Sequence, residues 1–488
     1  MKVFFIPILV FCISCEVSEL SDRRKWLHET LLEDNQIMIL REPELVKQKF
    51  SKMFSNYYFY FRGTFAQYYR DQDSSMNLLK TKIIDDDSAL IPLLGDPHLE
   101  NFGVFKDKEG RMIVDFNDFD TASYGPYYED LRRFLLSFYV TLKSLGIYSD
   151  ELMSQISDSY FKGYQEKLES SNGSDPIRAQ SDWSKPVLDM IKSAIKDGDE
   201  REKIEEYTRS GEMFFGYTDC GKTFKQADTC KASYKTPMID GIQLSYIKDI
   251  VLRVSEKEEE SIRKAIEFYP ETLMPNEFAD DFFKIKGVSR RFGAGVGSFP
   301  IKRYYVLLEG KTLELGDDVL LQIKEATPQI NQLDEFHMRR KFKNDAARVV
   351  FFTRMLQTSD YDDIYLGHLS MGDISFKVSE RTGYQKDLGH DDLNIYAPDE
   401  LIKLAYDCGY ILAHSYQRSI TLNGQSTLTV MQNLLKERIE ELKKETLSYV
   451  LKYGKIQDRD FLIFKDIVKK EGLLLGFSPA KYVGEIKR

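Results

Sequence analysis

Residues 94–103 of this 488-residue chain read Leu-Gly-Asp-Pro-His-Leu-Glu-Asn-Phe-Gly, and residues 113–120 read Ile-Val-Asp-Phe-Asn-Asp-Phe-Asp. Asp96 and Asn101 stand in the first stretch, and Asp115 follows an apolar run in the second. Phosphoryl transfer requires a carboxylate that orients the attacking hydroxyl and accepts its proton, together with oxygen ligands for Mg²⁺. The two stretches therefore predict a phosphotransferase site with Asp96 as the base and with Asn101 and Asp115 as metal ligands.

The segments around this site alternate between strand and helix patterns. Leu90–Leu94 and Met112–Phe116 are apolar runs that predict two strands, joined by a loop through Gly103. Glu129–Leu145 carries apolar residues at three- and four-residue steps, which is typical of a helix with one buried face, and Gly146 is its expected end. We expect the three polar side chains to meet at two adjacent strand ends.

Each polar residue of the two stretches also has a structural explanation. Asp96 and Asn101 are residue types that favour turns, and they could cap one without taking part in catalysis. His98 suits a hydrogen bond that orders the loop better than it suits the role of base. Asp118 is either a further metal ligand or a partner for backbone groups of the loop, and both alternatives stay open. For Asp120 we expect the second role.

Further side chains are predicted to support the catalytic loop. Asp130 is expected to anchor the loop from the following helix. Arg132 and Arg133 are expected to be one buried ion-pair partner and one surface charge. Arg62 follows five aromatic residues, and it either reaches a phosphate or substrate carboxylate through bidentate contacts or pins the first helix from a buried position.

A glycine-rich stretch downstream is a candidate for contact with phosphates. Gly293, Gly295 and Gly297, followed by Ser298, precede a predicted strand. Glycines let backbone N–H groups approach a phosphate closely. An ordinary hairpin loop explains the same pattern, so the spacing alone does not decide.

A lysine in the hairpin that follows is the second candidate for phosphate binding. Ile301–Leu308 and Val319–Ala326 are β-rich runs, and Lys324 lies near the end of the second. A lysine embedded in an apolar strand is uncommon and requires a partner charge. Protein kinases hold the nucleotide phosphates with a glycine-rich loop and a strand lysine, so we expect the same role for Lys324. Glu325 and Glu335 are both candidates for its carboxylate partner.

Two resemblances support this interpretation. The segment Gly-Asp-Pro-His-Leu-Glu-Asn resembles the catalytic loop of aminoglycoside and choline phosphotransferases, Gly-Asp-x-His-x-x-Asn, and Asp115 falls near the second metal-binding aspartate of that superfamily. The chain as a whole resembles the bacterial family known as domain of unknown function 2252, which is grouped with kinase-like folds. The segments that carry this resemblance are Phe61–Gly63, Gly95–Gly103, Asn117–Asp120, Asp130–Arg133, Gly295–Ser298, Leu321–Ala326 and Ala413–His414.

The resemblance implies an α+β, protein-kinase-like fold of two lobes, one mainly helical and one a smaller antiparallel β-sheet. Kinases place the nucleotide half before the catalytic half, whereas here it follows, so the lobes would be circularly permuted in the sequence. The predicted organisation is a helical catalytic part over residues 16–280 with an insertion at about 168–235, a β-rich nucleotide-binding part over 281–390, and C-terminal helices over 391–488.

The first residues of the chain resemble a targeting segment. Lys2 and a short apolar run to Ile13 are typical of an export signal and too short to span a bilayer. Cys15 stands where a bacterial lipoprotein carries its lipid, although Cys12 replaces the usual leucine. We therefore expect residues 1–15 to be an export or lipoprotein signal and the protein to be periplasmic or membrane-anchored at the cell surface. The alternative is a cytoplasmic protein.

Composition and cysteines limit the possible partners. A composition of 42 % hydrophobic and 30 % charged residues is that of a globular protein, and a net charge of −10 argues against broad nucleic-acid binding. Nothing in the sequence predicts an oligomer. Cys220 and Cys230 are either a disulfide or two free thiols, while Cys408 and His414 lie in apolar helical patterns and are expected in the core.

The sequence thus predicts a phosphotransferase that uses ATP and Mg²⁺ and acts on a hydroxyl of a small molecule. An exported domain would fold where ATP is scarce, which raises the alternative of a kinase-like pseudoenzyme or ligand-binding module. A nucleotidyl transferase that uses the same carboxylates is a further alternative, and a structural protein that retains the motif is the simplest one.

Overall fold

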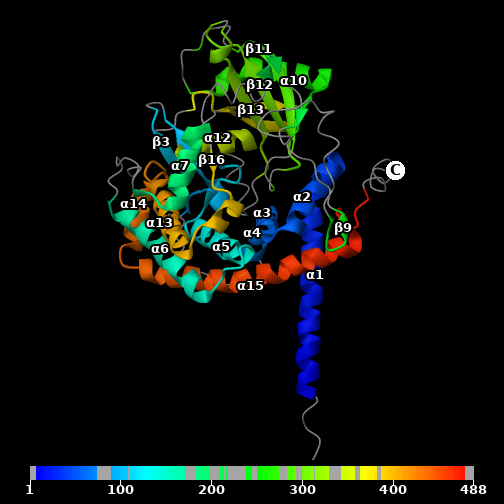
Figure 1. Cartoon of the computed structure of the whole chain (residues 1–488), viewed down its shortest axis with the longest axis vertical. Helices are drawn as coiled ribbons and strands as arrows, with labels where there is room; N and C mark the ends of the chain where they lie inside the picture. Colours follow the sequence, from blue (N-terminus) through cyan, green and yellow to red (C-terminus); the bar gives the residue numbers. More distant parts are fainter. Residues whose placement is uncertain are drawn as a thin grey trace, which may run out of the picture.

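The structure, a computed structural model, combines α-helices with antiparallel β-sheets, which confirms the α+β class (Figure 1). The largest sheet lies at one end of the molecule, and helices fill the other end (Figure 1). Of residues 7–20 only the backbone is described. The described residues are 7–73, 90–107, 110–170, 182–197, 250–274, 278, 283–292, 296, 299–312, 314–328, 342–357, 363–381 and 386–478, with short segments between 208 and 243.

The helices of the larger part pack around a close pair. In chain order they are α1 (Pro7–Arg41), α2 (Pro43–Ser55), α3 (Tyr57–Gly63), α4 (Phe65–Asp73), α5 (Tyr128–Ser144), α6 (Asp150–Ser170), α7 (Lys185–Asp197), α13 (Pro398–His414), α14 (Thr427–Leu435) and α15 (Ile439–Glu471). A Cβ on Gly409 of α13 would lie 1.9 Å from the carbonyl oxygen of Tyr160 in α6. Only glycine allows backbones to approach this closely.

The N-terminal and C-terminal helices are joined by a buried ion pair. The guanidinium of Arg23 in α1 contacts Asp71 of α4 at 2.7 Å and Asp460 of α15 at 2.5 Å. All three side chains are almost completely buried, so each charge depends on the others for compensation. This network joins α1 and α15 to α4, which forms part of the wall of the candidate site.

Two small ladders carry the predicted catalytic segment. They consist of β1 (Leu90–Leu93) paired with β4 (Ser123–Pro126), and of β2 (Phe102–Lys106) between β3 (Met112–Phe116) and β16 (Lys386–Asp387). Both predicted strands are therefore confirmed. The expected loop through Gly103 is wrong in part, because the residues from Phe102 onward form β2, an apolar strand that pairs with β3. Consequently β1 and β3 belong to different ladders rather than to adjacent positions of one sheet.

The large sheet contains the predicted hairpin. Its strands, in spatial order, are β14 (Gly367–Met371), β15 (Ile374–Glu380), β13 (Val319–Glu325), β12 (Arg303–Leu308), β11 (Ile285–Phe292), β10 (Ile250–Arg253) and β7 (Gly216–Tyr217). Neighbouring strands are antiparallel, which confirms the two runs predicted around Lys324. Helix α10 (Glu256–Phe268) precedes β11, and α12 (Asp345–Leu356) lies between β13 and β14 in sequence.

The two faces of this sheet differ in chemistry because strand side chains alternate between faces. On β13, Leu321 and Ile323 are buried in an apolar cluster that includes Ile262 and Ile266 of α10. Their neighbours Gln322 and Lys324 point to the opposite face, which lines a cavity. One face therefore stabilises the sheet, and the other supplies polar groups to the candidate site.

The segment that follows α13 lies beside β1. After α13, the backbone N–H of Leu422 donates a hydrogen bond to the carbonyl oxygen of Leu90 at 3.0 Å. The chain thus passes from the sheet through β16 and α13 to a position beside β1, although β1 comes far earlier in the sequence.

The remaining expectations about the chain concern its core and its termini. Cys408 and His414 are buried on α13, as expected. Cys220 and Cys230 lie outside the described residues, as do the side chains of the first 20 residues. Among the described residues, no helix is both long and apolar enough to cross a membrane.

Candidate active site

Asp130 holds the turn that carries Asp96. Its two carboxylate oxygens accept hydrogen bonds from the backbone N–H groups of Leu94, at 2.7 Å, and Gly95, at 3.0 Å. Gly95 has a φ of 84°, and a Cβ there would lie 2.4 Å from the carbonyl oxygen of Thr121, so the turn requires glycine. Burial raises the pKa of Asp130 to about 7, although the two N–H donors oppose the shift.

Asp96 is paired with an arginine of α5. Its Oδ1 accepts a hydrogen bond from Nε of Arg133 at 2.7 Å. Arg133 is completely buried, its guanidinium lies 3.6 Å from the centre of the Phe61 ring, and it also donates to the Phe61 carbonyl oxygen at 3.0 Å. Burial raises the pKa of Asp96, and the charge of Arg133 opposes this shift.

The expectation that one of the two neighbouring arginines is a surface charge is wrong. Arg132 is 3 % exposed, and its guanidinium stacks 4.2 Å from the Tyr128 ring and 4.7 Å from the Tyr449 ring. The helix pattern would place Arg132 at the surface if no other element covered that face of α5. Here α15 covers it, because Tyr449 belongs to α15.

Asn101 and His98 belong to the loop that carries Asp96. Nδ2 of Asn101 donates to the carbonyl oxygen of Asp96 at 3.0 Å, which leaves Oδ1 available as an oxygen ligand. His98 is 2 % exposed, and burial lowers its pKa well below the ordinary value, as do the charges of Arg62 and Arg133. His98 is therefore neutral at pH 7.

The two aspartates predicted as metal ligands, Asp115 and Asp118, differ in whether they line a cavity. Asp115 is 1 % exposed on β3, and its Oδ1 accepts a hydrogen bond from the backbone N–H of Phe116 at 2.7 Å. Asp115 lines neither of the two cavities described below, whereas Asp118 lines both. The difference arises because Asp115 still belongs to the paired strand, and Asp118 lies in the loop beyond its end.

Lys324 meets this loop from the sheet. Its Nζ lies 3.6 Å from Oδ2 of Asp118 and forms a shorter ion pair with Asp120. Burial opposes ionisation of Asp118, but the charges of Lys324 and Lys377 outweigh it and lower the pKa of Asp118 to about 2. The two halves of the predicted site therefore converge, and the side chain of Asp120, which was expected to satisfy backbone groups of the loop, pairs with the lysine.

Of the two glutamates considered as partners of Lys324, the described one, Glu325, is paired elsewhere. Glu325 pairs with Arg41 at 2.6 Å and accepts a hydrogen bond from the backbone N–H of Lys302 at 2.8 Å. Glu335 lies outside the described residues. Helix α12, which follows β13, has no glutamate; its buried Arg348 donates to the carbonyl oxygens of Ala122, Asp120 and Thr327.

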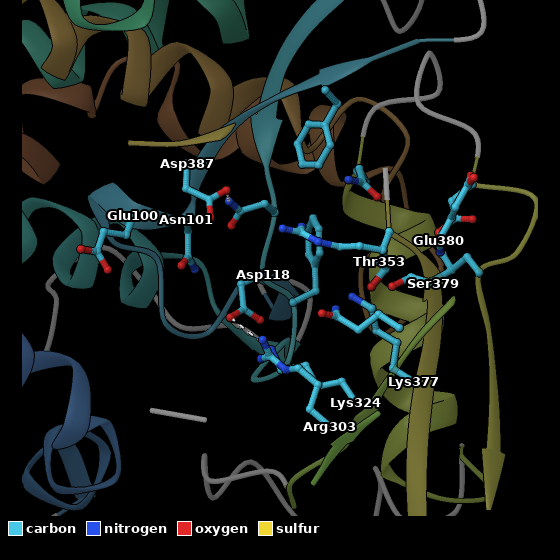
Figure 2. Close-up of a pocket in the computed structure, with 18 of the residues that line it drawn as sticks. Glu100, Asn101, Asp118, Arg303, Lys324, Thr353, Lys377, Ser379, Glu380 and Asp387 are labelled. Carbon is cyan, nitrogen blue, oxygen red and sulfur yellow. Dashed lines mark hydrogen bonds and ion pairs between the residues drawn. The ribbon is translucent and has the colours of Figure 1, made fainter. Parts of the chain in front are cut away.

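Two adjoining cavities meet at this point. The first, of about 520 Å³, is enclosed by the sheet, α12 and the catalytic segment, and Figure 2 shows Asn101 and Asp118 facing Arg303, Lys324 and Lys377 across it. The second, of about 650 Å³, is enclosed by α1 to α4, the Asp96 loop and the end of β13. Arg62, Asn101 and Asp118 line both cavities, and Asp96 lines the second.

Arg62 separates the two cavities as part of a charged cluster. Its guanidinium pairs with Glu100 of η2 (Leu99–Asn101), and Glu100 also contacts Nδ1 of His390 at 2.9 Å. Burial disfavours the charge on Glu100, but Arg62 and His390 outweigh it and lower the pKa of Glu100 to about 2. Arg62 is thus held by Glu100 and lines both cavities, and its contact with a phosphate or substrate carboxylate stays a prediction.

Some of the predicted site residues lie outside the described part of the chain. Gly293, Gly295, Gly297 and Ser298 lie outside the described residues, in the connection between β11 and β12. Within the described residues, no cluster of three or more histidine, cysteine, aspartate or glutamate side chains is placed to hold a metal ion. A metal at this site would therefore depend on Asn101 and Asp118 together with ligand oxygens.

Sequence reasoning missed three cations of the site. The sequence patterns do not identify Arg133 as the partner of Asp96, nor do they assign Lys377 on β15 and Lys49 on α2 to the site. Lys377 follows a strand pattern like that of Lys324, so its position in an apolar strand was a usable signal. For Lys49, burial lowers the pKa to about 8, although Asp34 opposes the shift; nothing in the helical pattern of α2 indicates this burial.

The sequence model of a family described as "Uncharacterized protein conserved in bacteria (DUF2252)" matches residues 41–467. The match covers most of the chain, so the chain belongs to this family. No curated protein and no solved structure matches the chain significantly.

Proposed function

We propose that this member of the DUF2252 family is a phosphotransferase that moves a phosphoryl group from Mg–ATP to a hydroxyl group of a small molecule. The observation that carries the proposal is the contact of Lys324 with Asp118 and Asp120, because it unites two segments predicted independently as halves of one site. The two cavities that share Arg62, Asn101 and Asp118 supply space for a donor and an acceptor.

The donor half resembles the nucleotide-binding lobe of protein kinases. Those enzymes hold phosphates with a glycine-rich loop and a lysine on the third strand, followed by a helix. Here β11, β12 and β13 are consecutive neighbours, Lys324 lies on β13, and α12 follows. The Gly-x-Gly-x-Gly stretch falls between β11 and β12. The order of these strands, the lysine and the helix matches that of the kinase lobe, which supports placing the nucleotide in the first cavity.

The order of the halves also supports a permuted kinase-like fold. In such a permutation, the helix that precedes the catalytic loop in kinases comes late in this sequence, and it must still end beside the segment that leads into the loop. The hydrogen bond from Leu422 to Leu90, after α13 and before the Asp96 turn, meets this requirement. Termini that lie close together are what allows a permutation to preserve a fold.

The donor atoms at the junction of the two cavities fit Mg²⁺. Mg²⁺ is bound by one or two carboxylate or amide oxygens, with substrate phosphates and water completing its shell. Asn101 Oδ1 and Asp118 provide this set, and the lowered pKa of Asp118 keeps its carboxylate ionised. The ion, when bound, would neutralise charge on the phosphates. We therefore assign the role first expected of Asp115 to Asp118.

The acceptor hydroxyl would lie in the second cavity beside Asp96. Its oxygen attacks the γ-phosphorus, the bond from that phosphorus to the bridging oxygen breaks, and ADP leaves with the electron pair. Asp96 orients the hydroxyl and accepts its proton. Burial makes Asp96 more basic than a free aspartate, while Arg133 keeps it ionised and fixes its orientation.

A second candidate function is a module that binds a phosphorylated ligand without transferring a group. The direct pairing of Asp96 with Arg133 favours it, since the charge of Arg133 makes Asp96 a weaker base than burial alone would make it. The predicted export signal is consistent with the same alternative, because an exported domain would fold where ATP is scarce.

The test is incubation with Mg²⁺ and γ-labelled ATP in the presence of sugars, polyols and amino alcohols. We expect wild-type protein to label an acceptor by the mass of one phosphate and Asp96→Asn to lose this activity while still binding the nucleotide. Binding without any product would support the second candidate. Addition of AMP instead of phosphate would identify a nucleotidyl transferase, and absence of nucleotide binding would contradict the proposal.

A further inference from the structure

The cavity face of the large sheet carries a row of cations. Arg303 on β12 lies directly opposite Lys324 on β13, and Lys324 lies directly opposite Lys377 on β15. Directly opposite residues of antiparallel strands point to the same face, with Cβ atoms about 4.5–5.5 Å apart. All three side chains line the first cavity, and Figure 2 shows them together with Asp118.

Such a row is unfavourable without anions. Like charges on directly opposite strand positions destabilise a sheet, and burial adds the cost of desolvation. Lys324 is compensated by Asp118 and Asp120. Within the described residues, the side chain of Lys377 forms no hydrogen bond and no ion pair, although Asp120, Asp118 and Asp363 favour its charge from a distance.

Burial and the charge of Lys324 lower the pKa of Lys377, while Asp120 opposes the shift. An enclosed lysine without a direct partner is a rare arrangement. Replacement by an apolar residue would remove this cost, so the presence of Lys377 in the wall of the cavity indicates a ligand. The ligand must be an anion that reaches past the carboxylates already paired with Lys324.

We propose that Lys377 is a second phosphate-binding lysine, which makes the site selective for a triphosphate chain over a monophosphate. The proposal rests on the proposed function for the identity of the nucleotide, but the preference for a polyphosphate anion depends only on the row of cations. A chain that runs along Arg303, Lys324 and Lys377 gives each cation a phosphate oxygen, and it allows Asp118 to turn from Lys324 toward the metal.

The experiment compares the binding of Mg–ATP, Mg–ADP, AMP and inorganic tripolyphosphate by isothermal titration calorimetry. The variants are Lys377→Met, Lys377→Arg and Lys324→Met. Lys264→Met is the control, because Lys264 lies on α10, pairs with Glu260 at the surface and lines neither cavity. Thermal unfolding without ligand is measured for every variant.

We expect Lys377→Met to weaken binding of ATP and tripolyphosphate by roughly tenfold or more, as for the loss of a charge-assisted hydrogen bond. Binding of AMP should stay within about twofold of wild type. Lys377→Arg should recover most of the affinity. Without ligand, Lys377→Met should unfold at the same temperature as wild type or higher, since no ion pair is lost. A purely structural lysine would not produce this combination.

Several outcomes would overturn the inference. If Lys377→Met binds ATP and tripolyphosphate like wild type while Lys324→Met does not, Lys377 has no role and the proposed function stands. Equal losses for AMP and ATP, with a lower unfolding temperature, would make Lys377 structural. If wild type binds tripolyphosphate but not ATP, the row of cations is an anion site and the proposed function fails. Binding of neither would contradict both.

Discussion

The ammonium of Lys324 lies 3.6 Å from the carboxylate of Asp118, and these residues come from two segments far apart in the sequence. The contact joins the large sheet to the loop after β3. Both side chains also line the first cavity. In the proposed site, a metal ion would replace Lys324 as the partner of Asp118, and a phosphate would replace Asp118 as the partner of Lys324.

The first prediction concerns which aspartate binds the metal. We expect Asp118→Asn to abolish the stabilisation that Mg–ATP gives to wild type, because an amide cannot supply the charge that Mg²⁺ requires. At a ligand concentration 100 times the dissociation constant this stabilisation amounts to about 2.7 kcal/mol. Thermal unfolding with and without Mg–ATP measures it.

Asp115→Asn is the matched control for this prediction. Asp115 lies on β3 outside both cavities, so its amide variant should keep the Mg–ATP effect even if the unliganded protein becomes less stable. The reverse pattern, with Asp115→Asn insensitive to Mg–ATP and Asp118→Asn responsive, would return the metal site to Asp115.

The sequence predicts the segments of this site better than it predicts their partners. The Asp96–Asn101 spacing, the helix that bears Asp130 and the strand that bears Lys324 follow from local patterns. In the structure, Asp130 binds the backbone of Gly95, and Asn101 and Lys324 line the same cavity. The choice between Asp115 and Asp118 depends on where the pairing of β3 ends. This boundary is set by β2, whose partner strand β16 comes from a distant part of the chain.

The second prediction concerns the pair of Asp96 and Arg133. Arg133→Met should destabilise the protein by about 3–5 kcal/mol, because it leaves Asp96 as a buried carboxylate without its cation. Urea unfolding measures this loss. The double variant with Asp96→Asn should recover part of it, since the uncompensated charge is then absent. A double variant that loses the sum of both single effects would show that the pair is not coupled.

The third prediction concerns pH. The folded protein raises the pKa of Asp130 to about 7 from 3.8, so it binds a proton between these values that the unfolded chain releases. The resulting stabilisation is present below about pH 4 and is lost as the pH rises through 7. We expect Asp130→Asn to reduce this decline between pH 5 and pH 8 in urea unfolding. Profiles of wild type and variant that stay parallel would contradict it.

The fourth prediction uses Lys49, whose Nζ donates to Oδ1 of Asn35 at 2.8 Å in the wall of the second cavity. Its pKa is lowered to about 8, so the unfolded chain holds this proton up to higher pH than the folded one. Stability should therefore rise between about pH 8 and pH 10 in wild type and less in Lys49→Met. Lys47→Met, on the outer side of the same helix, should behave like wild type. An equal rise in all three proteins would show that Lys49 is solvated.

Contacts between distant segments also explain two features that the sequence does not predict, the burial of Arg132 and the partners of Lys324. Arg132 has the pattern of a surface residue, and only the packing of α15 over α5 buries it. The partner of Lys324 was sought among nearby glutamates, whereas Asp118 and Asp120 approach from the other part of the fold. Ion pairs of this kind follow from the tertiary arrangement and have no local signal.

The most direct measurement is a crystal structure of the protein with Mn²⁺ and a non-hydrolysable ATP analogue. An anomalous peak within about 2.3 Å of Oδ1 of Asn101 and of the Asp118 carboxylate, with analogue phosphates beside Lys324, is the predicted result. A metal peak away from Asn101 and Asp118, or an analogue bound outside the first cavity, would contradict the account.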